Sequence, residues 1–148
     1  MTFSRKVTCP YCGASERIPA ERFSDDLVCG ACGRAMFGGR PIELDAARFG
    51  ELLTDEKPLL VDYWASWCGP CKAMAPAFEQ AARSLEDTVQ FAKLNTDDEQ
   101  QIAQEHGIRS IPTMILFHGG KEIARHSGAM SAGDIQTWVE NHLADAAA

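Results

Sequence analysis

The 148-residue sequence has no apolar run near the roughly 20 residues that a membrane-spanning helix needs. Its first eight residues include two basic side chains, but no apolar stretch follows them, so they do not resemble a secretory signal peptide. These two absences argue against a membrane protein and against export. We therefore expect a cytoplasmic protein that does not associate with membranes.

Positive charge is scarce in the larger part of the chain. The net charge is −7, from 14 Lys and Arg against 21 Asp and Glu. Residues 41–148 hold eight basic and seventeen acidic residues, which gives −9, whereas residues 1–40 hold six and four, which gives +2. The acidic part would repel nucleic-acid phosphates, so no nucleic acid is expected as a partner. Both imbalances are typical of solvated surface.

No cysteine lies outside a Cys-x-x-Cys pair. The six cysteines form three pairs: Cys9 with Cys12, Cys29 with Cys32, and Cys68 with Cys71. Disulfides of secreted scaffolds are rarely confined to this spacing, which in a chain without an export signal indicates metal ligands or redox centres. No histidine precedes His106, so mixed cysteine and histidine ligation near the N-terminus is not expected.

The sequence Gly-Gly-Arg-Pro at residues 38–41 predicts a connector between a small module, residues 1–40, and a domain, residues 41–148. In the domain, strand and helix patterns alternate. Strands are expected at 41–44, 59–65, 89–95, 113–117 and 122–126, and helices at 45–53, 68–85, 98–106 and from 131 onward. This order predicts an α/β fold, with a mixed central sheet flanked by helices on both faces.

The pair Cys68 and Cys71 lies where the strand at 59–65 gives way to a helix. Two intervening residues on such a turn let the two sulfurs approach within bonding distance. A helix N-terminus supplies unpaired N–H groups and partial positive charge, which favour the nucleophilic thiolate. We therefore predict a redox pair in which Cys68 is the accessible nucleophile and Cys71 is the shielded resolving thiol.

Two alternatives stay open for this pair. A zinc half-site would need two more ligands, and no spare cysteine remains once the N-terminal four are used. The other alternative is two inert, buried cysteines.

The residues around the pair also suit a redox site. Pro70 suits the first helical turn, because its missing N–H would have had no partner there. Trp64 and Trp67 could shield the site from water and offer apolar surface to a partner protein.

Asp62 interrupts the apolar strand six residues before Cys68. Burial would raise the pKa of its carboxyl group, which suits a proton acceptor for Cys71. The alternative is a carboxylate hydrogen-bonded to backbone at a strand edge. Lys93, in the next strand, could pair with Asp62 or face solvent. Pro112 precedes a strand, where proline is unusual, and the residues alone favour a trans bond after Ile111.

The four N-terminal cysteines recur as Cys-x-x-Cys-Gly, with sixteen residues between Cys12 and Cys29. Two such pairs on tight turns, which the glycines permit, make a tetrahedral four-sulfur site typical of zinc. A segment of about 40 residues has little core, so the metal would supply its stability. We predict one Zn²⁺, held by Cys9, Cys12, Cys29 and Cys32, and no organic cofactor. Two redox pairs or a rubredoxin-like iron site are alternatives, and oxidative release of the metal is a hypothesis.

Residues 41–144 resemble thioredoxin. The highly specific motif Trp-Cys-Gly-Pro-Cys-Lys occupies residues 67–72. Other positions also match that family: Asp62 its buried aspartate, Pro76 its helix-kinking proline, Pro112 its cis-proline, and Lys93, Gly120 and Gly128. With the N-terminal cysteines included, nearly the whole chain resembles the zinc-containing thioredoxins of bacteria.

The resemblance implies a thioredoxin fold, reduction of disulfides in client proteins by a Cys68–Cys71 dithiol–disulfide cycle, and recharging by a thioredoxin reductase. It implies catalytic roles for Cys68, Cys71, Asp62 and Pro112, supported by Lys93. It places the surface around them at Trp67, Gly69, Pro70, Ile111, Thr113 and Gly128. Two alternative hypotheses compete with this one. The protein could be a binding module that recognises its partner through the zinc ribbon, or it could be an oxidant that forms disulfides. By the resemblance, the Gly-Pro dipeptide between the cysteines favours the reducing direction.

Overall fold

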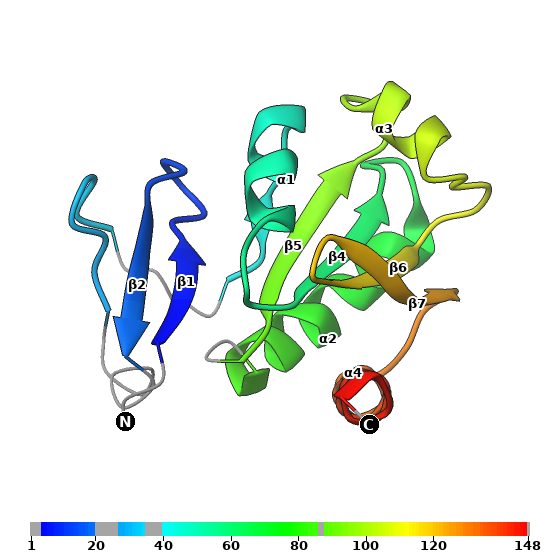
Figure 1. Cartoon of the computed structure of the whole chain (residues 1–148). Coiled ribbons are helices and arrows are strands. Elements are labelled where there is room, and N and C mark those ends of the chain that lie inside the picture. Colours follow the sequence, from blue (N-terminus) through cyan, green and yellow to red (C-terminus); the bar gives the residue numbers. More distant parts are fainter. Residues whose placement is uncertain (1–3, 20–26, 35–39, 86–87, 148) are drawn as a thin grey trace.

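The computed structural model describes residues 4–19, 27–34, 40–85 and 88–147 (Figure 1). Within these ranges, the strands β1 (Ser4–Thr8) and β2 (Ser15–Pro19) form an antiparallel hairpin. The remaining strands form one five-stranded sheet in the order β3-β5-β4-β6-β7. None of the helices in the described ranges is both long enough and apolar enough to cross a lipid bilayer.

The larger sheet is mixed, as the sequence predicts. Its strands are β3 (Ile42–Glu43), β4 (Leu59–Trp64), β5 (Gln90–Asn95), β6 (Thr113–His118) and β7 (Lys121–Ser127). The first three are parallel, β6 runs antiparallel to β4, and β7 runs antiparallel to β6. The helices are α1 (Ala46–Leu53), α2 (Gly69–Leu85), α3 (Gln100–Glu105) and α4 (Ala132–Ala147). The predicted element order of the domain is therefore confirmed.

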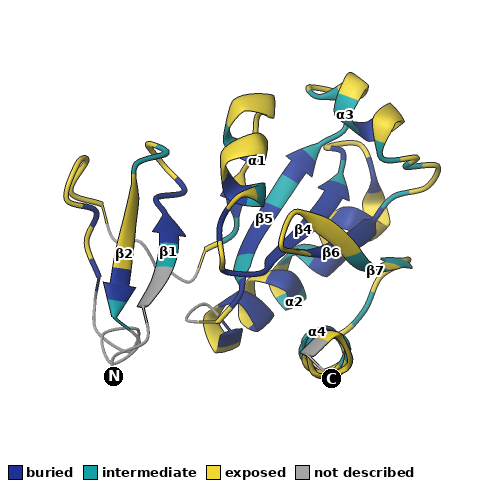
Figure 2. Cartoon of the chain, in the orientation of Figure 1, coloured by how far each residue is buried: buried dark blue, intermediate teal, exposed yellow. Residues whose placement is uncertain are grey.

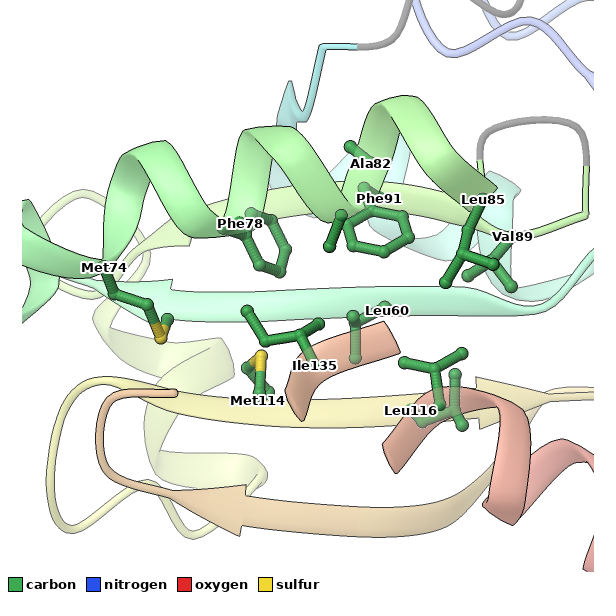
Figure 3. Packing of buried hydrophobic residues seen from close by; sticks show 12 residues of the cluster. Leu60, Met74, Phe78, Ala82, Leu85, Val89, Phe91, Met114, Leu116 and Ile135 are labelled. Carbon is green, nitrogen blue, oxygen red and sulfur yellow. The ribbon is translucent and has the colours of Figure 1, made fainter. Parts of the chain in front are cut away.

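The helices cover both faces of the sheet. One apolar cluster packs α2 and α4 against residues such as Leu60, Phe91 and Met114 (Figure 3). The second cluster packs α1 against the opposite face, where Val61 and Tyr63 lie. Because successive residues of a strand point to opposite faces, β4 contributes to both clusters and is almost wholly buried (Figure 2). This burial confirms the prediction that the strand expected at 59–65 is buried on both faces; it ends at Trp64.

Local signals account for the helix boundaries. The side chain of Asp45 accepts a hydrogen bond from the Arg48 N–H at 2.8 Å and caps α1. At α4, the hydroxyl of Ser131 accepts from the Asp134 N–H at 3.2 Å, and these two residues have the spacing of a capping box. Pro76 lies inside α2, where it removes one donor from the helical ladder.

The N-terminal module, meaning the described residues 4–19 and 27–34, packs against the domain beside α1. The Thr8 N–H donates to the buried Asp55 carboxylate at 2.9 Å, and the Lys6 N–H donates to Glu56 at 2.9 Å. Gly13, in the left-handed region at φ +83°, lies against side chains of α1. The β1–β2 hairpin was not predicted, and residues 38 and 39 of the proposed connector at 38–41 lie outside the described residues.

Candidate functional site

The paired cysteines lie at the start of α2, directly after the central strand. Cys68 immediately precedes the helix and Cys71 lies in its first turn. The two are joined by a disulfide, with their Cα atoms 5.3 Å apart. The Cys71 N–H donates to the Cys68 sulfur at 3.2 Å. An otherwise unpaired N–H of the first helical turn therefore faces the sulfur that would carry the thiolate charge.

Access to the pair differs between the two sulfurs, although neither residue is openly exposed. Cys68 is 4% exposed and Cys71 is 2% exposed. Cys68 lines a groove of about 460 Å³ together with Trp67, Pro70, Arg109 and Ile111, whereas Cys71 does not line it. The accessibility expected for Cys68 is thus provided by a groove, and not by open surface.

The segment opposite the cysteines comes from the start of β6. The bond between Ile111 and Pro112 is cis, so the trans form favoured by the residues alone is wrong and the form implied by the resemblance is found. The Ile111 carbonyl oxygen lies 3.8 Å from the Cys68 sulfur. The Thr113 hydroxyl donates to the Ser110 carbonyl at 2.7 Å, and the Gly128 N–H donates to the Pro112 carbonyl at 2.8 Å.

The two tryptophans near the pair have different surroundings. Trp67 is 69% exposed, and its indole N–H donates to Asp97 at 3.0 Å. Trp64 is half-buried and packs against the cysteine cluster, with the Lys93 ammonium 4.2 Å from its ring centroid. Only Trp67 therefore offers the broad apolar surface expected of both. The sequence did not predict the contact between Trp67 and Asp97, because no local pattern links two residues that are thirty positions apart.

Asp62 is a carboxyl group buried in the central strand β4. It is 1% exposed, and neither oxygen accepts a hydrogen bond from the described residues. The alternative of a backbone-bonded carboxylate is therefore not supported. Burial raises its pKa to about 7, the nearby Lys93 charge opposes this rise, and Glu43 adds to it. Asp62 lies on the α2 face of the sheet, two residues after Leu60, and α2 also carries Cys71.

The four N-terminal cysteines converge on one point. Their sulfurs all lie within 4.8 Å of one another. The Cys9 and Cys32 sulfurs are 3.7 Å apart, and those of Cys12 and Cys29 are 3.6 Å apart. Four sulfurs bound tetrahedrally to zinc at about 2.3 Å would be separated by about 3.8 Å, so the donor set fits the metal.

Both Cys-x-x-Cys turns of this centre have the same backbone geometry. The Gly13 N–H donates to the Cys9 carbonyl at 3.0 Å, and the Gly33 N–H donates to the Cys29 carbonyl at 2.9 Å. Each first cysteine also accepts a backbone N–H from two residues later, at 3.4 Å. Such N–H groups stabilise thiolate charge. Gly13 and Gly33 both have positive φ, as the predicted turns require.

Two family models match the chain. The model described as thioredoxin covers residues 40–141, and the model described as thioredoxin 2, N-terminal, a zinc ribbon, covers residues 8–34. Thioredoxin C-3 of Corynebacterium nephridii is 38% identical over 138 residues, which span 93% of this chain and 94% of that protein.

Two further comparisons bear on fold and partner. A crystal structure of thioredoxin from Malassezia sympodialis superposes with a TM-score of 0.63 at 35% identity, covering 68% of this chain and 88% of that one. A bifunctional thioredoxin reductase/thioredoxin of Mycobacterium leprae is 47% identical over 85 residues, which are 57% of this chain and 19% of that protein.

Proposed function

This chain belongs to the thioredoxin family and is a thiol–disulfide oxidoreductase, and from that premise we propose that it reduces disulfides in client proteins, with Cys68 as nucleophile. The observation that carries the proposal is the bonded cysteine pair at the start of α2. There a first-turn N–H contacts the sulfur that lines the groove. Such a contact favours a thiolate at Cys68 over one at Cys71.

The reaction proceeds in two exchanges. The Cys68 thiolate attacks one sulfur of the client disulfide, the client's sulfur–sulfur bond breaks, and its other sulfur leaves as a thiolate. Cys71 then loses its proton to Asp62, and its thiolate attacks the Cys68 sulfur. This expels the second client sulfur, so the client gains two electrons and Cys68 and Cys71 become a disulfide. Asp62 suits the acceptor role because its raised pKa lies near neutrality.

The groove supports a client segment that lies extended beside Cys68. The backbone around Ile111 and Pro112 borders the sulfur and can pair with such a segment as a strand would. The exposed ring of Trp67 supplies apolar contact, and its N–H bond to Asp97 fixes its orientation.

A thioredoxin reductase returns the two electrons to the Cys68–Cys71 disulfide in this proposal. Support comes from the Mycobacterium leprae relative, whose name joins both activities in one chain. A disulfide assay coupled to such a reductase and to NADPH tests the reductive direction. A strongly oxidising potential of the pair, or no turnover with the reductase, would favour the oxidant reading instead.

Replacing Cys71 by serine is expected to stop the cycle at the mixed disulfide. Cys68 can still attack, but no thiolate remains beside it to release the client, so covalent adducts accumulate. Non-reducing gel electrophoresis with mass spectrometry after incubation with insulin measures the adducts. The double variant Cys68→Ser/Cys71→Ser serves as the control and should form none. Equal adduct levels in the two variants would contradict the assigned order of attack.

We also propose that Cys9, Cys12, Cys29 and Cys32 hold one zinc ion that stabilises the N-terminal module. Bound zinc would neutralise thiolate charge and cross-link the two turns, and no step of the exchange reaction passes through it. The proposal is supported by the sulfur spacing and by the zinc-ribbon model that matches residues 8–34. It assigns residues 1–40 to the module and 41–148 to the thioredoxin domain.

The double variant Cys12→Ser/Cys32→Ser is expected to lose the metal, because two of four ligands are gone. Metal analysis should find one zinc per chain in the wild type and none in this variant. Loss of the metal should lower the melting temperature of the module, measured by calorimetry on the whole chain. Cys71→Ser is the matched control and should retain one zinc. Stoichiometric iron in the wild type, or zinc retained by the double variant, would overturn the assignment.

A further inference from the structure

Three charged side chains form a row across the parallel half of the sheet. Glu43 of β3 is paired in register with Lys93 of β5, and Lys93 is paired with Asp62 of β4. Residues paired in this way point to the same face of a sheet. That face is the one covered by α2, which carries Cys71. The row therefore runs from the buried carboxyl group of the central strand to the edge strand of the sheet.

Solvent access increases along this row. Asp62 is fully buried, Lys93 is half-buried over the ring of Trp64, and Glu43 is exposed. Glu43 and Lys93 line a cavity of about 460 Å³ whose walls also include Arg40, Glu79 and Arg83. Asp62 does not line this cavity. In the order of pairing, Lys93 and Glu43 lie between Asp62 and this cavity.

The charges around Glu43 come from several elements. Asp45 and Arg48, at the N-terminal end of α1, line a second cavity with it. Lys93 of β5 is paired with it, Arg40 precedes its own strand, Glu79 and Arg83 belong to α2, and Asp98 follows β5. Partial desolvation raises the pKa of Glu43, and the Lys93 charge and the indole N–H of Trp64 oppose this rise. The indole N–H does not complete a hydrogen bond with Glu43. Glu43 in turn adds to the raised pKa of Asp62, because its negative charge disfavours a second one nearby.

We propose that Glu43 is a positioning residue at the solvent end of a proton path that runs from Asp62 past Lys93 to the cavity, and that it governs how fast Asp62 is recharged for the Cys71 step. This inference rests on the role of Asp62 proposed above. Asp62 can accept the Cys71 proton only as a carboxylate, and with a pKa of about 7 it often carries a proton at neutral pH, which it must lose before the Cys71 step. The Lys93 ammonium passes one proton to the Glu43 carboxylate and takes one from Asp62, and Glu43 then releases a proton to water.

The test is a rapid-mixing experiment on the full chain with Glu43→Gln. Reduced protein is mixed with an equimolar aromatic disulfide whose leaving thiolate is coloured. The first thiolate released reports attack by Cys68, and the second reports resolution by Cys71. We expect the rate of the first step to be unchanged and the rate of the second to fall at least about threefold. This fall is smaller than the loss expected when a general base is removed, because Asp62 is still present. The pH midpoint of the second step should move downward, because a negative charge near Asp62 has been removed.

Two further measurements separate proton transfer from a structural effect. Imidazole, a small proton carrier, should accelerate the second step of Glu43→Gln at constant ionic strength and leave the wild type unaffected. Glu43→Asp, which keeps a carboxylate, should recover part of the rate. Glu79→Gln is the matched control, since Glu79 lines the same cavity from α2 but lies outside the row. It should match the wild type in rate, pH midpoint and imidazole response.

The outcomes distinguish the role of Glu43 from the role proposed for Asp62, on which it rests. If Asp62→Asn slows the second step while Glu43→Gln behaves as Glu79→Gln does, the path through Glu43 is refuted and the role of Asp62 stands. If Asp62→Asn also resolves at the wild-type rate, the role of Asp62 itself is wrong. A carboxyl-carbon NMR titration of Asp62 in the Glu43→Gln protein provides a second readout, and an unmoved titration there would also refute the coupling.

Discussion

Disulfide reduction is expected to fall to the rate of the blank when Cys68 is replaced by serine. A serine hydroxyl does not ionise near neutrality and cannot form a disulfide, so the first exchange has no nucleophile. The Cys71 sulfur cannot substitute for it, because Cys71 is 2% exposed and does not line the groove. The measurement is insulin reduction coupled to a thioredoxin reductase and NADPH, with metal content determined on the same sample.

The control for this variant is its zinc content and fold. The N-terminal cysteines form a separate cluster, so Cys68→Ser should keep the metal and the far-ultraviolet dichroism of the wild type. A second control, Cys29→Ser, should retain insulin reduction in its thioredoxin domain, since none of the described residues of the module lines the groove. Substantial insulin reduction by Cys68→Ser would place the chemistry on another sulfur.

Replacing Asp62 by asparagine is expected to raise the stability of the protein at neutral pH and to slow its reaction. Burial raises the folded pKa of Asp62 from 3.8 to about 7, so the folded state holds a proton that the unfolded chain has already released. The resulting destabilisation is absent below about pH 4, grows between about pH 4 and 7, and is complete above that range. Three units of pKa correspond to on the order of 4 kcal/mol.

Removing the ionisable group should therefore raise the free energy of unfolding at about pH 8 by up to that amount, and change it little at about pH 4. Urea denaturation of the oxidised protein at several pH values measures this difference. Glu79→Gln should leave the pH dependence of the wild type in place, because that carboxylate is exposed. An Asp62→Asn protein with the same pH dependence as the wild type would show that the carboxyl group is not buried as described.

The second effect of Asp62→Asn is kinetic. Without a carboxylate to accept its proton, Cys71 ionises only through water, and resolution of the mixed disulfide should slow about 100-fold at neutral pH. The deficit should shrink as pH rises, because hydroxide then removes the proton. The same rapid-mixing assay reads this second exchange separately from attack by Cys68.

The sequence predicts the parts of this fold that depend on local signals. The apolar run of β4, the capping spacing of Ser131 and Asp134 at α4, and the cysteine pair at a strand-to-helix junction all act within a few residues. The convergence of four sulfurs was also predictable, because the spacing of the pairs constrains how their turns can face one another. These features need no knowledge of how distant strands pair.

Other features depend on contacts between distant segments, and local reasoning missed them. The β1 sequence Ser-Arg-Lys-Val-Thr is too short and polar to stand out as a strand, and it is held by pairing with β2. The place of Glu43 beside Lys93 follows from strand order, which only the assembled sheet defines. The near-complete burial of Cys68 depends on Ile111, forty-three residues later.

The position at which the N-terminal module packs on the domain has a practical consequence. Its hydrogen bonds run from β1 to Asp55 and Glu56, just ahead of the central strand, whereas the redox pair follows the far end of that strand. An immobilising tag or a fused carrier attached at the N-terminus would therefore leave the groove at Cys68 open to clients. Chain anchored to a resin in this way should still turn over, and could capture clients from solution.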